Sequence, residues 1–272
     1  MDDRSVAGHE ELVLLRENRG HVTILTLNRP AARNSLSESL LRALGAAFAD
    51  IADTPAIWVV LLTAASPAFC AGHDLRELTA HRSGPDGGRA YFEHTMRLCA
   101  NVMQSIVSCP KPVIAAINGT ATAAGCQLVA SCDLAVASET AHFATPGVNI
   151  GLFCSTPAVA LARNVGRKRA MEMLLLGGMI PAMQAMEFGL INKVVPEEDV
   201  MQEAMRWAGT IASKSPLTMR LGKEAFRRQF DMPLAEAYDY AARAMVENMM
   251  THDAEEGIGA FLEKRQPHWQ GR

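Results

Sequence analysis

The stretch PVIAAINGTATAAGCQLVASCDLAVAS, residues 112–138, decides the fold expected for this chain. It opens with the apolar run PVIAAI, passes through small residues into a short helical segment, and ends with a second β-rich run. Both runs have the length of a buried strand. A strand, a loop, a helix and another strand in this order predict a parallel or mixed sheet with helices packed outside, and loops at the strand ends where ligands gather.

The same alternation extends on both sides of this stretch. Two β-rich runs joined by a turn at Arg19 and Gly20 precede a helical pattern over residues 35–53. A fully apolar strand over residues 56–64 and a helix over residues 89–109 follow. After Pro157 the pattern is amphipathic helix, with INKVVP as the one strand-like run, so the last quarter of the chain is expected to be helical.

Composition excludes several classes of function. The 272 residues are 49% hydrophobic and 20% charged, with a net charge of −3 and no basic run, so we expect neither nucleic acid nor an anionic lipid surface as a partner. The apolar runs are far shorter than the roughly 20 residues of a membrane helix. The acidic first dozen residues lack the features of a signal or transit peptide, which predicts a cytoplasmic location.

The six cysteines have no C-x-x-C spacing. We therefore expect reduced, mostly buried thiols and no metal site. The sequence also has no G-x-G-x-x-G motif after a strand, no Walker loop and no G-x-S-x-G motif. It therefore lacks the motifs typical of dinucleotide binding, nucleotide-phosphate binding and serine-hydrolase activity.

Two loops remain as candidates for chemistry. SPAFCAGHDLREL, Ser66 to Leu78, follows one buried strand and enters a helix at Asp74; NGTATAAGCQLVASCD, Asn118 to Asp133, follows the next and enters a helix near Ala124. Free N–H groups at two helix starts can converge on one point and stabilise an oxyanion without any side chain. Each loop alone is typical of an ordinary strand-to-helix turn, whereas the two together indicate an oxyanion site.

Five motifs, NRPAARNSLS, FCAGHDLREL, PVIAAINGTATAAGCQLVASCDLAVAS, FATPGVNIGL and AMEFGLINKVV, resemble in order and spacing the enoyl-CoA hydratase/isomerase family, the crotonase superfamily. The resemblance runs from about Leu12 to Trp269. It implies an α/β crotonase (ClpP-like) spiral of ββα units with a C-terminal helical trimerisation region. On this basis we expect a core with the acyl-CoA site over residues 1–210, an oligomerisation region over residues 211–272, and a homotrimer or a dimer of trimers.

The resemblance also implies an acyl-CoA thioester as ligand, with coenzyme A entering as part of the substrate and no separate cofactor. The thioester oxygen would be held by the backbone N–H groups of His73 and Ala124. The positions that match residues lining the CoA moiety are Ala32, Arg33, Ser35, Asp74 and Leu75, and Lys264 or Arg265 would meet a CoA phosphate. Asp74 also begins a helix, and capping of the free amides at the helix start explains this residue without any catalytic role.

The family's acid and base are not present in this sequence. Where hydratases of the family carry two glutamates, this chain has Gln127 and Gly147, and Ser155 matches the carboxylate position of the isomerase branch. Gln127 either hydrogen-bonds a carbonyl or a water, or merely fills a helix-start position. Asn149 and Ser155 lie in the loop that faces the acyl chain in the family. The His73 side chain is expected to point away from the carbonyl.

A positioned general acid or base is worth about 10²- to 10⁴-fold in rate, and an oxyanion-hole donor about 10²- to 10³-fold. The surviving amides therefore predict thioester binding with weak hydration. Two functions stay open: an acyl-CoA enzyme that hydrates weakly or runs a different acyl-CoA reaction, and a non-catalytic acyl-CoA-binding or regulatory protein.

Overall fold

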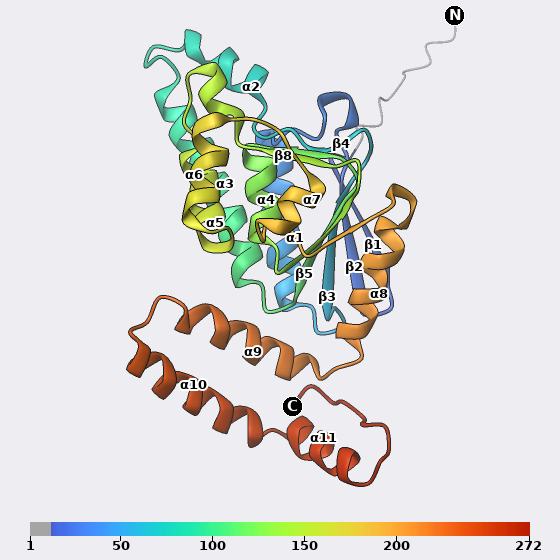
Figure 1. Ribbon diagram of the computed structural model, residues 1–272. Helices are drawn as coiled ribbons and strands as arrows, with labels where there is room; N and C mark the ends of the chain where they lie inside the picture. The colour runs from blue at the N-terminus through green and yellow to red at the C-terminus, as the bar shows by residue number, and fades with distance from the viewer. Residues whose placement is uncertain (1–11) are drawn as a thin grey trace, which may run out of the picture.

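The computed structural model describes residues 12–272, which form two β-sheets with helices around them (Figure 1). The larger sheet has the strand order β1-β2-β3-β5-β7-β10. Its strands are β1 (Leu14–Arg19), β2 (Val22–Leu27), β3 (Val59–Ala64), β5 (Val113–Ile117), β7 (Leu134–Ser138) and β10 (Lys193–Val195). The hairpin of β1 and β2 turns at Gly20, whose φ of 58° suits glycine, and every later pair in this sheet is parallel.

A second, smaller sheet has the order β4-β6-β8-β9. Its strands are β4 (Ala68–Cys70), β6 (Thr120–Thr122), β8 (His142–Ala144) and β9 (Ile180–Pro181). Each of β3, β5 and β7 is followed closely by a short strand of this sheet and then by helix. The helices that follow are α2 (Leu75–Ala80) with α3 (Arg89–Ser108), α4 (Ala124–Ser131), and α5 (Ser155–Asn164). The predicted spiral of ββα units is confirmed.

The two faces of the larger sheet pack against different helices. Val60 and Leu62 of β3 belong to the main core, together with buried residues of α1 (Glu38–Asp53), α3 and α4. Val59 and Leu61 face the other way and pack with Val200, Ala204 and Ala208 of α8 (Val200–Ala212). Both faces of the strand are therefore covered, which explains why its sequence is apolar throughout.

The remaining helices belong either to the body, which consists of the two sheets and the helices packed on them, or to a separate helical layer. The body carries α6 (Arg167–Leu176), α7 (Ala182–Glu187) and the 3₁₀ turns η1 (Pro30–Ala32), η2 (His81–Ser83), η3 (Pro146–Ile150) and η4 (Glu197–Asp199). Helices α9 (Pro216–Gln229), α10 (Leu234–Met249) and α11 (His252–Leu262) form a layer beside one end of the body, opposite α2 (Figure 1). The last quarter of the chain is helical, as predicted.

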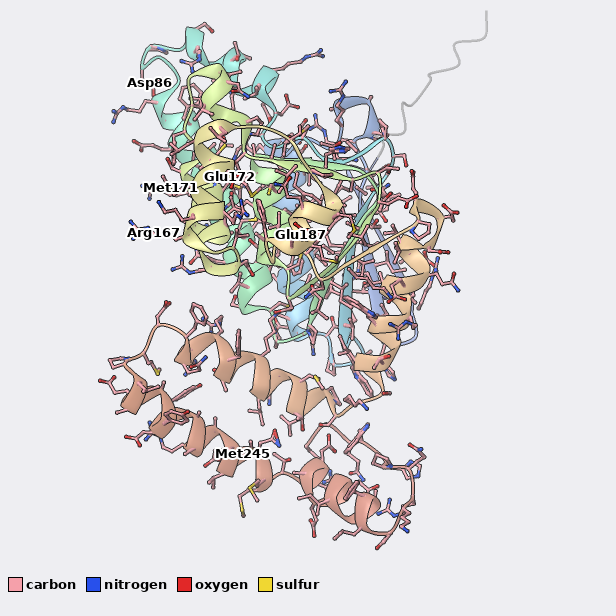
Figure 2. All side chains as sticks on the ribbon, in the orientation of Figure 1. Asp86, Arg167, Met171, Glu172, Glu187 and Met245 are labelled. Carbon is pink, nitrogen blue, oxygen red and sulfur yellow. The ribbon has the colours of Figure 1, made fainter. Side chains whose placement is uncertain are left out.

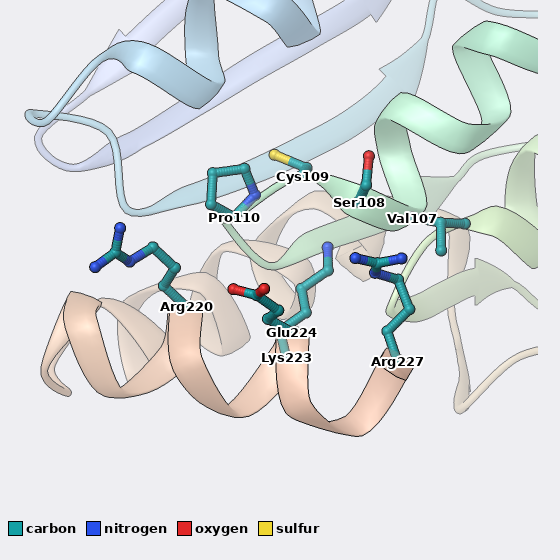
Figure 3. A pocket seen from close by; sticks show the side chains of 8 residues that line it. All are labelled: Val107, Ser108, Cys109, Pro110, Arg220, Lys223, Glu224 and Arg227. Carbon is teal, nitrogen blue, oxygen red and sulfur yellow. The ribbon is translucent and has the colours of Figure 1, made fainter. Parts of the chain in front are cut away.

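Lys223 ties α9 to the body. Its Nζ donates to Asp133 Oδ2 at 2.6 Å, and to the carbonyl oxygens of Lys111 at 3.1 Å and Ile106 at 3.3 Å. Lys223 also lines a cavity of about 270 Å³, together with Val107, Ser108, Cys109, Pro110, Arg220, Glu224 and Arg227 (Figure 3). The cavity belongs to the junction of body and helical layer.

The helical layer leaves many apolar side chains uncovered in a single chain. Met245 of α10 lies in this layer (Figure 2) and is 61% exposed. Its exposed neighbours along the chain include Phe226, Phe230, Tyr238, Met249, Met250 and Phe261. Apolar surface of this extent is typical of an interaction site between proteins.

All six cysteines are free thiols, as predicted, and five of them are buried. Over residues 12–272, no helix is long and apolar enough to cross a membrane.

Candidate functional site

The small sheet brings the two candidate loops into contact. Strand β4 lies within the first loop and β6 within the second, and they pair in parallel with Cys70 beside Ala121. A Cβ added to Gly72 would lie 2.9 Å from Ala123 Cβ and 3.4 Å from Ala124 N, and one added to Gly125 would overlap the carbonyl oxygen of Cys70. The two glycines are therefore needed because the loops touch through backbone.

Each loop presents backbone amides that have no acceptor; in the second loop these are the first amides of α4, those of Ala124, Gly125 and Cys126. Within residues 12–272, the N–H groups of His73 and Ala124 donate to no acceptor, while the neighbouring amides of Asp74 and Ala123 bond to Leu36 O and Ala144 O. Ala124 is the first residue of α4, a position whose N–H has no partner inside the helix. Free donors on two contacting loops are the kind of groups from which an oxyanion hole is built.

Ala123 is held in a strained conformation just before the second amide. Its φ of 51° and ψ of −118° lie in a region that residues with a Cβ rarely adopt. Strain of this kind costs about 1–3 kcal/mol and gathers at functional sites. Here it marks the turn by which the chain leaves β6 and starts α4.

The segment before α1 braces the first loop. Leu36 N donates to Gly72 O at 2.7 Å, Asp74 N to Leu36 O at 3.2 Å, and Ala71 N to Arg33 O at 3.1 Å. These bonds place the loop that contains Ala32, Arg33 and Ser35 alongside the loop that contains His73, Asp74 and Leu75. The residues predicted to line the CoA moiety in these two segments are thus brought together.

Two residues that the sequence did not single out hold this arrangement. Arg29 bonds to Asp74 Oδ2 at 2.9 Å and to Ser35 O at 2.6 Å. The buried amide of Asn34 donates to the carbonyl oxygens of Ala65 and Ala68, both at 2.7 Å, and accepts from Arg29 N. Asn34 has a φ of 53°, which asparagine tolerates better than most residues. This preference is the feature of the motif NRPAARNS from which a structural role of Asn34 could have been predicted.

Asp74 caps α2 by accepting hydrogen bonds from the amides of Arg76 and Glu77, so the capping interpretation is confirmed. Burial opposes ionisation of this carboxyl, but the hydrogen bonds and charge of Arg29 and the helix amides outweigh it and lower its pKa. Asp74 is therefore an ionised structural anchor beside the His73 amide.

Gln127 lies one helical turn after Ala124 and is 4% exposed. Its own N–H donates to Ala123 O at 3.0 Å, whereas its side-chain Oε1 has no hydrogen-bond partner in the described chain. Helical side chains lean toward the N-terminus of their helix, so the Gln127 side chain is expected to lean toward the start of α4.

His73 is half-buried, and its two ring nitrogens are shielded from solvent and have no hydrogen-bond partner within residues 12–272. Burial lowers its pKa to about 4, which keeps the ring neutral near pH 7. His73 forms an isolated parallel bridge with Leu36, so the two side chains lie on the same side of the bridge. Leu36 is buried in the main core, which indicates that the ring is directed into the body.

The position of the second family glutamate is closed. A Cβ on Gly147 would lie 2.6 Å from Leu152 O and 2.9 Å from Cys154 Sγ, and Leu152 N donates to Gly147 O at 2.9 Å. A glutamate would require the backbone of residues 152–154 to move. Gly147 therefore has no space for a larger side chain in this arrangement of the loop.

Two predicted positions, Lys264 and Arg265, lie apart from the two loops within one chain (Figure 1). Asn149 and Ser155 are exposed and bond to nearby carbonyl oxygens, those of Gly177 at 3.2 Å and Phe153 at 3.4 Å. The Arg265 guanidinium pairs with Glu256 and Glu263, and with Lys264 it follows α11 in the layer opposite α2 (Figure 1). The structure does not bring Lys264 or Arg265 to the two loops within one chain (Figure 1).

Comparison with known proteins agrees with this architecture. The family model for enoyl-CoA hydratase/isomerase matches residues 17–272. Enoyl-CoA hydratase domain-containing protein 3 from Rattus norvegicus is 49% identical to this chain, and the match covers 90% of this chain and 80% of the rat protein. The Homo sapiens protein is also 49% identical, and the match covers 90% of this chain and 79% of the human protein. The crystal structure of the human protein has a TM-score of 0.90 at 47% identity, covering 94% of this chain and all of that one. An enoyl-CoA hydratase from Mycobacterium smegmatis has a TM-score of 0.90 at 48% identity, covering 94% and 98%.

The motif pair ATAAGCQLVASCD and FATPGVNIGLFCSTP resembles the group to which the rat and human relatives belong, and the comparison confirms that resemblance. The prediction of a cytoplasmic location is wrong in this light, because the five vertebrate relatives, at 45–49% identity, are all named mitochondrial. Residues 1–11, on which that prediction mostly rested, lie outside the described part of the chain. The motifs, the spiral fold and the matched relatives agree, and the chain belongs to the enoyl-CoA hydratase/isomerase family.

Proposed function

We propose that this protein binds an acyl-CoA thioester, holds its carbonyl oxygen between the N–H groups of His73 and Ala124, and polarises it without efficient hydration. The observation that carries the proposal is the pair of unpaired amides on two loops in contact. Such donors stabilise negative charge that develops on a carbonyl oxygen. In this proposal the segments around Arg33 and Asp74 line the CoA moiety.

Hydration is expected to be slow because nothing at the family's glutamate positions exchanges a proton. Gln127 carries an amide, Gly147 has no side chain, and His73 is neutral with a pKa of about 4. The closure of the Gly147 position by residues 152–154 also favours a second candidate, a non-catalytic acyl-CoA-binding or regulatory protein. The two candidates share the binding step and differ only in turnover.

The binding step is tested by calorimetry with butyryl-CoA and with S-butyl-CoA, a thioether that lacks the carbonyl oxygen. We expect the thioester to bind at least about ten-fold more tightly, because only the thioester accepts hydrogen bonds from the two amides. Equal binding of the two ligands would contradict the oxyanion role. Absence of binding by both would remove the proposed function altogether.

A backbone variant tests Ala124 directly. Ala124→Pro deletes one donor at the first position of α4, where helices tolerate proline. Arg167→Pro makes the same change at the first position of α6, which Figure 2 shows on the body. We expect Ala124→Pro to lose the preference for butyryl-CoA over S-butyl-CoA and Arg167→Pro to keep it, with thermal unfolding used to verify that both fold.

Turnover is tested with crotonyl-CoA by following the loss of the enoyl group and the mass of the product. We expect a rate lower by about 10²-fold or more than that of a hydratase with both glutamates. A different product on this or another enoyl-CoA would favour an enzyme, and bound, unchanged ligand would favour the non-catalytic protein. A rate in the ordinary enzymatic range would contradict the assignment of Gln127 and Gly147.

We also propose that residues 211–272 form the oligomerisation region of a homotrimer or a dimer of trimers, with residues 1–210 as the core. The exposed apolar side chains of α9, α10 and α11 support this assembly, because closed symmetry covers such a surface on every copy. Light scattering should give three or six times 29.4 kDa. A stable folded species of monomer mass would refute the proposal.

A further inference from the structure

The cavity at the junction of body and helical layer is lined on one side by charged side chains of α9 (Figure 3). Its volume of about 270 Å³ is far above the roughly 10–15 Å³ that one water molecule needs. It lies beside α9, at the end of the body opposite α2, whereas the residues predicted to line the CoA moiety lie next to α2 (Figure 1). The cavity therefore has room for a small ligand that the proposed function does not use.

Three cations that line this cavity share one face of α9. Arg220, Lys223 and Arg227 have the spacing i, i+3 and i+7, which places them on one side of a helix. Figure 3 shows these side chains directed from α9 toward residues 107–110, where α3 ends. The anionic Glu224 also lines the cavity, but its carboxylate pairs with Arg228 at 2.7 Å.

Two of the three cations have no anionic partner. Lys223 pairs with Asp133, whereas the guanidinium groups of Arg220 and Arg227 make neither an ion pair nor a hydrogen bond within residues 12–272. Lys111, which follows the end of α3, is likewise without an ion pair in the described chain. Burial lowers the pKa of Lys111, and the nearby charge of Arg220 lowers it as well. Cations placed this close repel one another, and a bound anion would relieve the repulsion.

We propose that Arg220 and Arg227 bind a phosphate group in this cavity, at a site separate from that of CoA. A guanidinium donates parallel N–H groups to two phosphate oxygens. A phosphate monoester carries a charge of about −1.5 to −2 near pH 7, which matches two unpaired arginines, and a carboxylate carries only −1. The ligand is either a free phosphate ion or a small phosphate monoester, because both carry the same group. It would join α9 to the end of α3 and add to the contact made by Lys223.

Calorimetry in a phosphate-free buffer of low ionic strength compares inorganic phosphate, glycerol 3-phosphate, acetate and glycerol. We expect both phosphates to bind, acetate to bind at least about ten-fold more weakly, and glycerol not to bind. Added salt should weaken binding, since both arginines are exposed. Tighter binding of glycerol 3-phosphate would identify a monoester as the ligand, and equal binding a free ion. Absence of binding by both phosphates, or acetate binding as tight as theirs, would overturn the proposal.

A double variant and a matched control locate the site. Arg220→Gln combined with Arg227→Gln should weaken phosphate binding at least about ten-fold, because each substitution removes charge-assisted hydrogen bonds. Arg97→Gln removes an exposed arginine of α3 that does not line the cavity, and should leave phosphate binding unchanged. Phosphate binding that survives in the double variant would overturn the proposal. Weaker binding of butyryl-CoA by the double variant would also overturn it, because the two arginines would then serve CoA itself.

Discussion

The guanidinium of Arg29 lies 2.9 Å from the carboxylate of Asp74 and joins two segments that are far apart in the chain. The side chains are 22% and 13% exposed, so both charges are largely shielded from water. The same guanidinium bonds to Ser35 O. This one side chain therefore holds the segment before α1 against the loop that carries the His73 amide.

Arg29→Met is expected to lower the free energy of unfolding by about 2 kcal/mol, because it leaves the Asp74 carboxylate shielded and without its charged partner. It should also weaken acyl-CoA binding by loosening the first loop. The measurements are urea unfolding and calorimetry. Arg19→Met is the control: Arg19 pairs with Glu17, both more than half exposed, so a loss of stability there as large as that of Arg29→Met would show that the effect is not specific to the site.

The lowered pKa of His73 predicts that the protein loses stability in mild acid. Its pKa is about 4 in the folded protein, below the 6.5 of an exposed histidine, so the unfolded chain binds the proton more strongly. The contribution is fully present above pH 6.5 and is lost as the pH falls toward 4, by about 3 kcal/mol at most. Unfolding measured between these pH values should show a smaller loss for His73→Phe than for the unaltered protein.

His142→Phe makes the same substitution at an exposed histidine and supplies the comparison for this measurement. If the free energy of unfolding depends on pH in the same way in His73→Phe and in the unaltered protein, the His73 ring is not the titrating group.

Restoring the two family glutamates should not restore a hydratase. In Gly147→Glu the new Cβ meets Leu152 O at 2.6 Å, so the segment 152–154 must move, at a cost of about 1–3 kcal/mol. The double variant with Gln127→Glu should therefore hydrate crotonyl-CoA within about ten-fold of the unaltered protein. Thermal unfolding and the hydration rate are the measurements.

Gly166→Ala is the matched control for the stability effect, because a Cβ there meets nothing within 4 Å. A double variant that is fully stable and hydrates at an enzymatic rate would mean that the Gly147 position is open in solution.

Lys223→Met should detach α9 from the body. The substitution removes an ion pair of 2.6 Å to Asp133 and two bonds to backbone carbonyl oxygens. We expect a loss of about 2 kcal/mol and faster proteolysis in the turn around Ser213 and Lys214, while Lys168→Met on the exposed face of α6 should change neither. Unchanged proteolysis would show that apolar packing alone holds the helical layer.

The sequence by itself determined the long elements of this protein. The helices predicted over residues 35–53 and 89–109 are observed at Glu38–Asp53 and Arg89–Ser108, and the apolar run at 56–64 contains β3. It also identified the two glycine-containing loops and the replacement of the family glutamates. These features are local: a hydrophobic period or a motif is written in consecutive residues, and burial of the apolar face enforces it.

Only the tertiary structure decided how the site is assembled. Strands β4, β6, β8 and β9 have two or three residues each, too few to show a period, and they exist because each pairs with a neighbour distant in the chain. The Arg29–Asp74 contact, the closure of Gly147 by Leu152 and the unpaired Oε1 of Gln127 are likewise relations between segments. Such relations depend on which segments come into contact in the folded protein. The pattern of residues that are neighbours in the sequence does not determine these contacts.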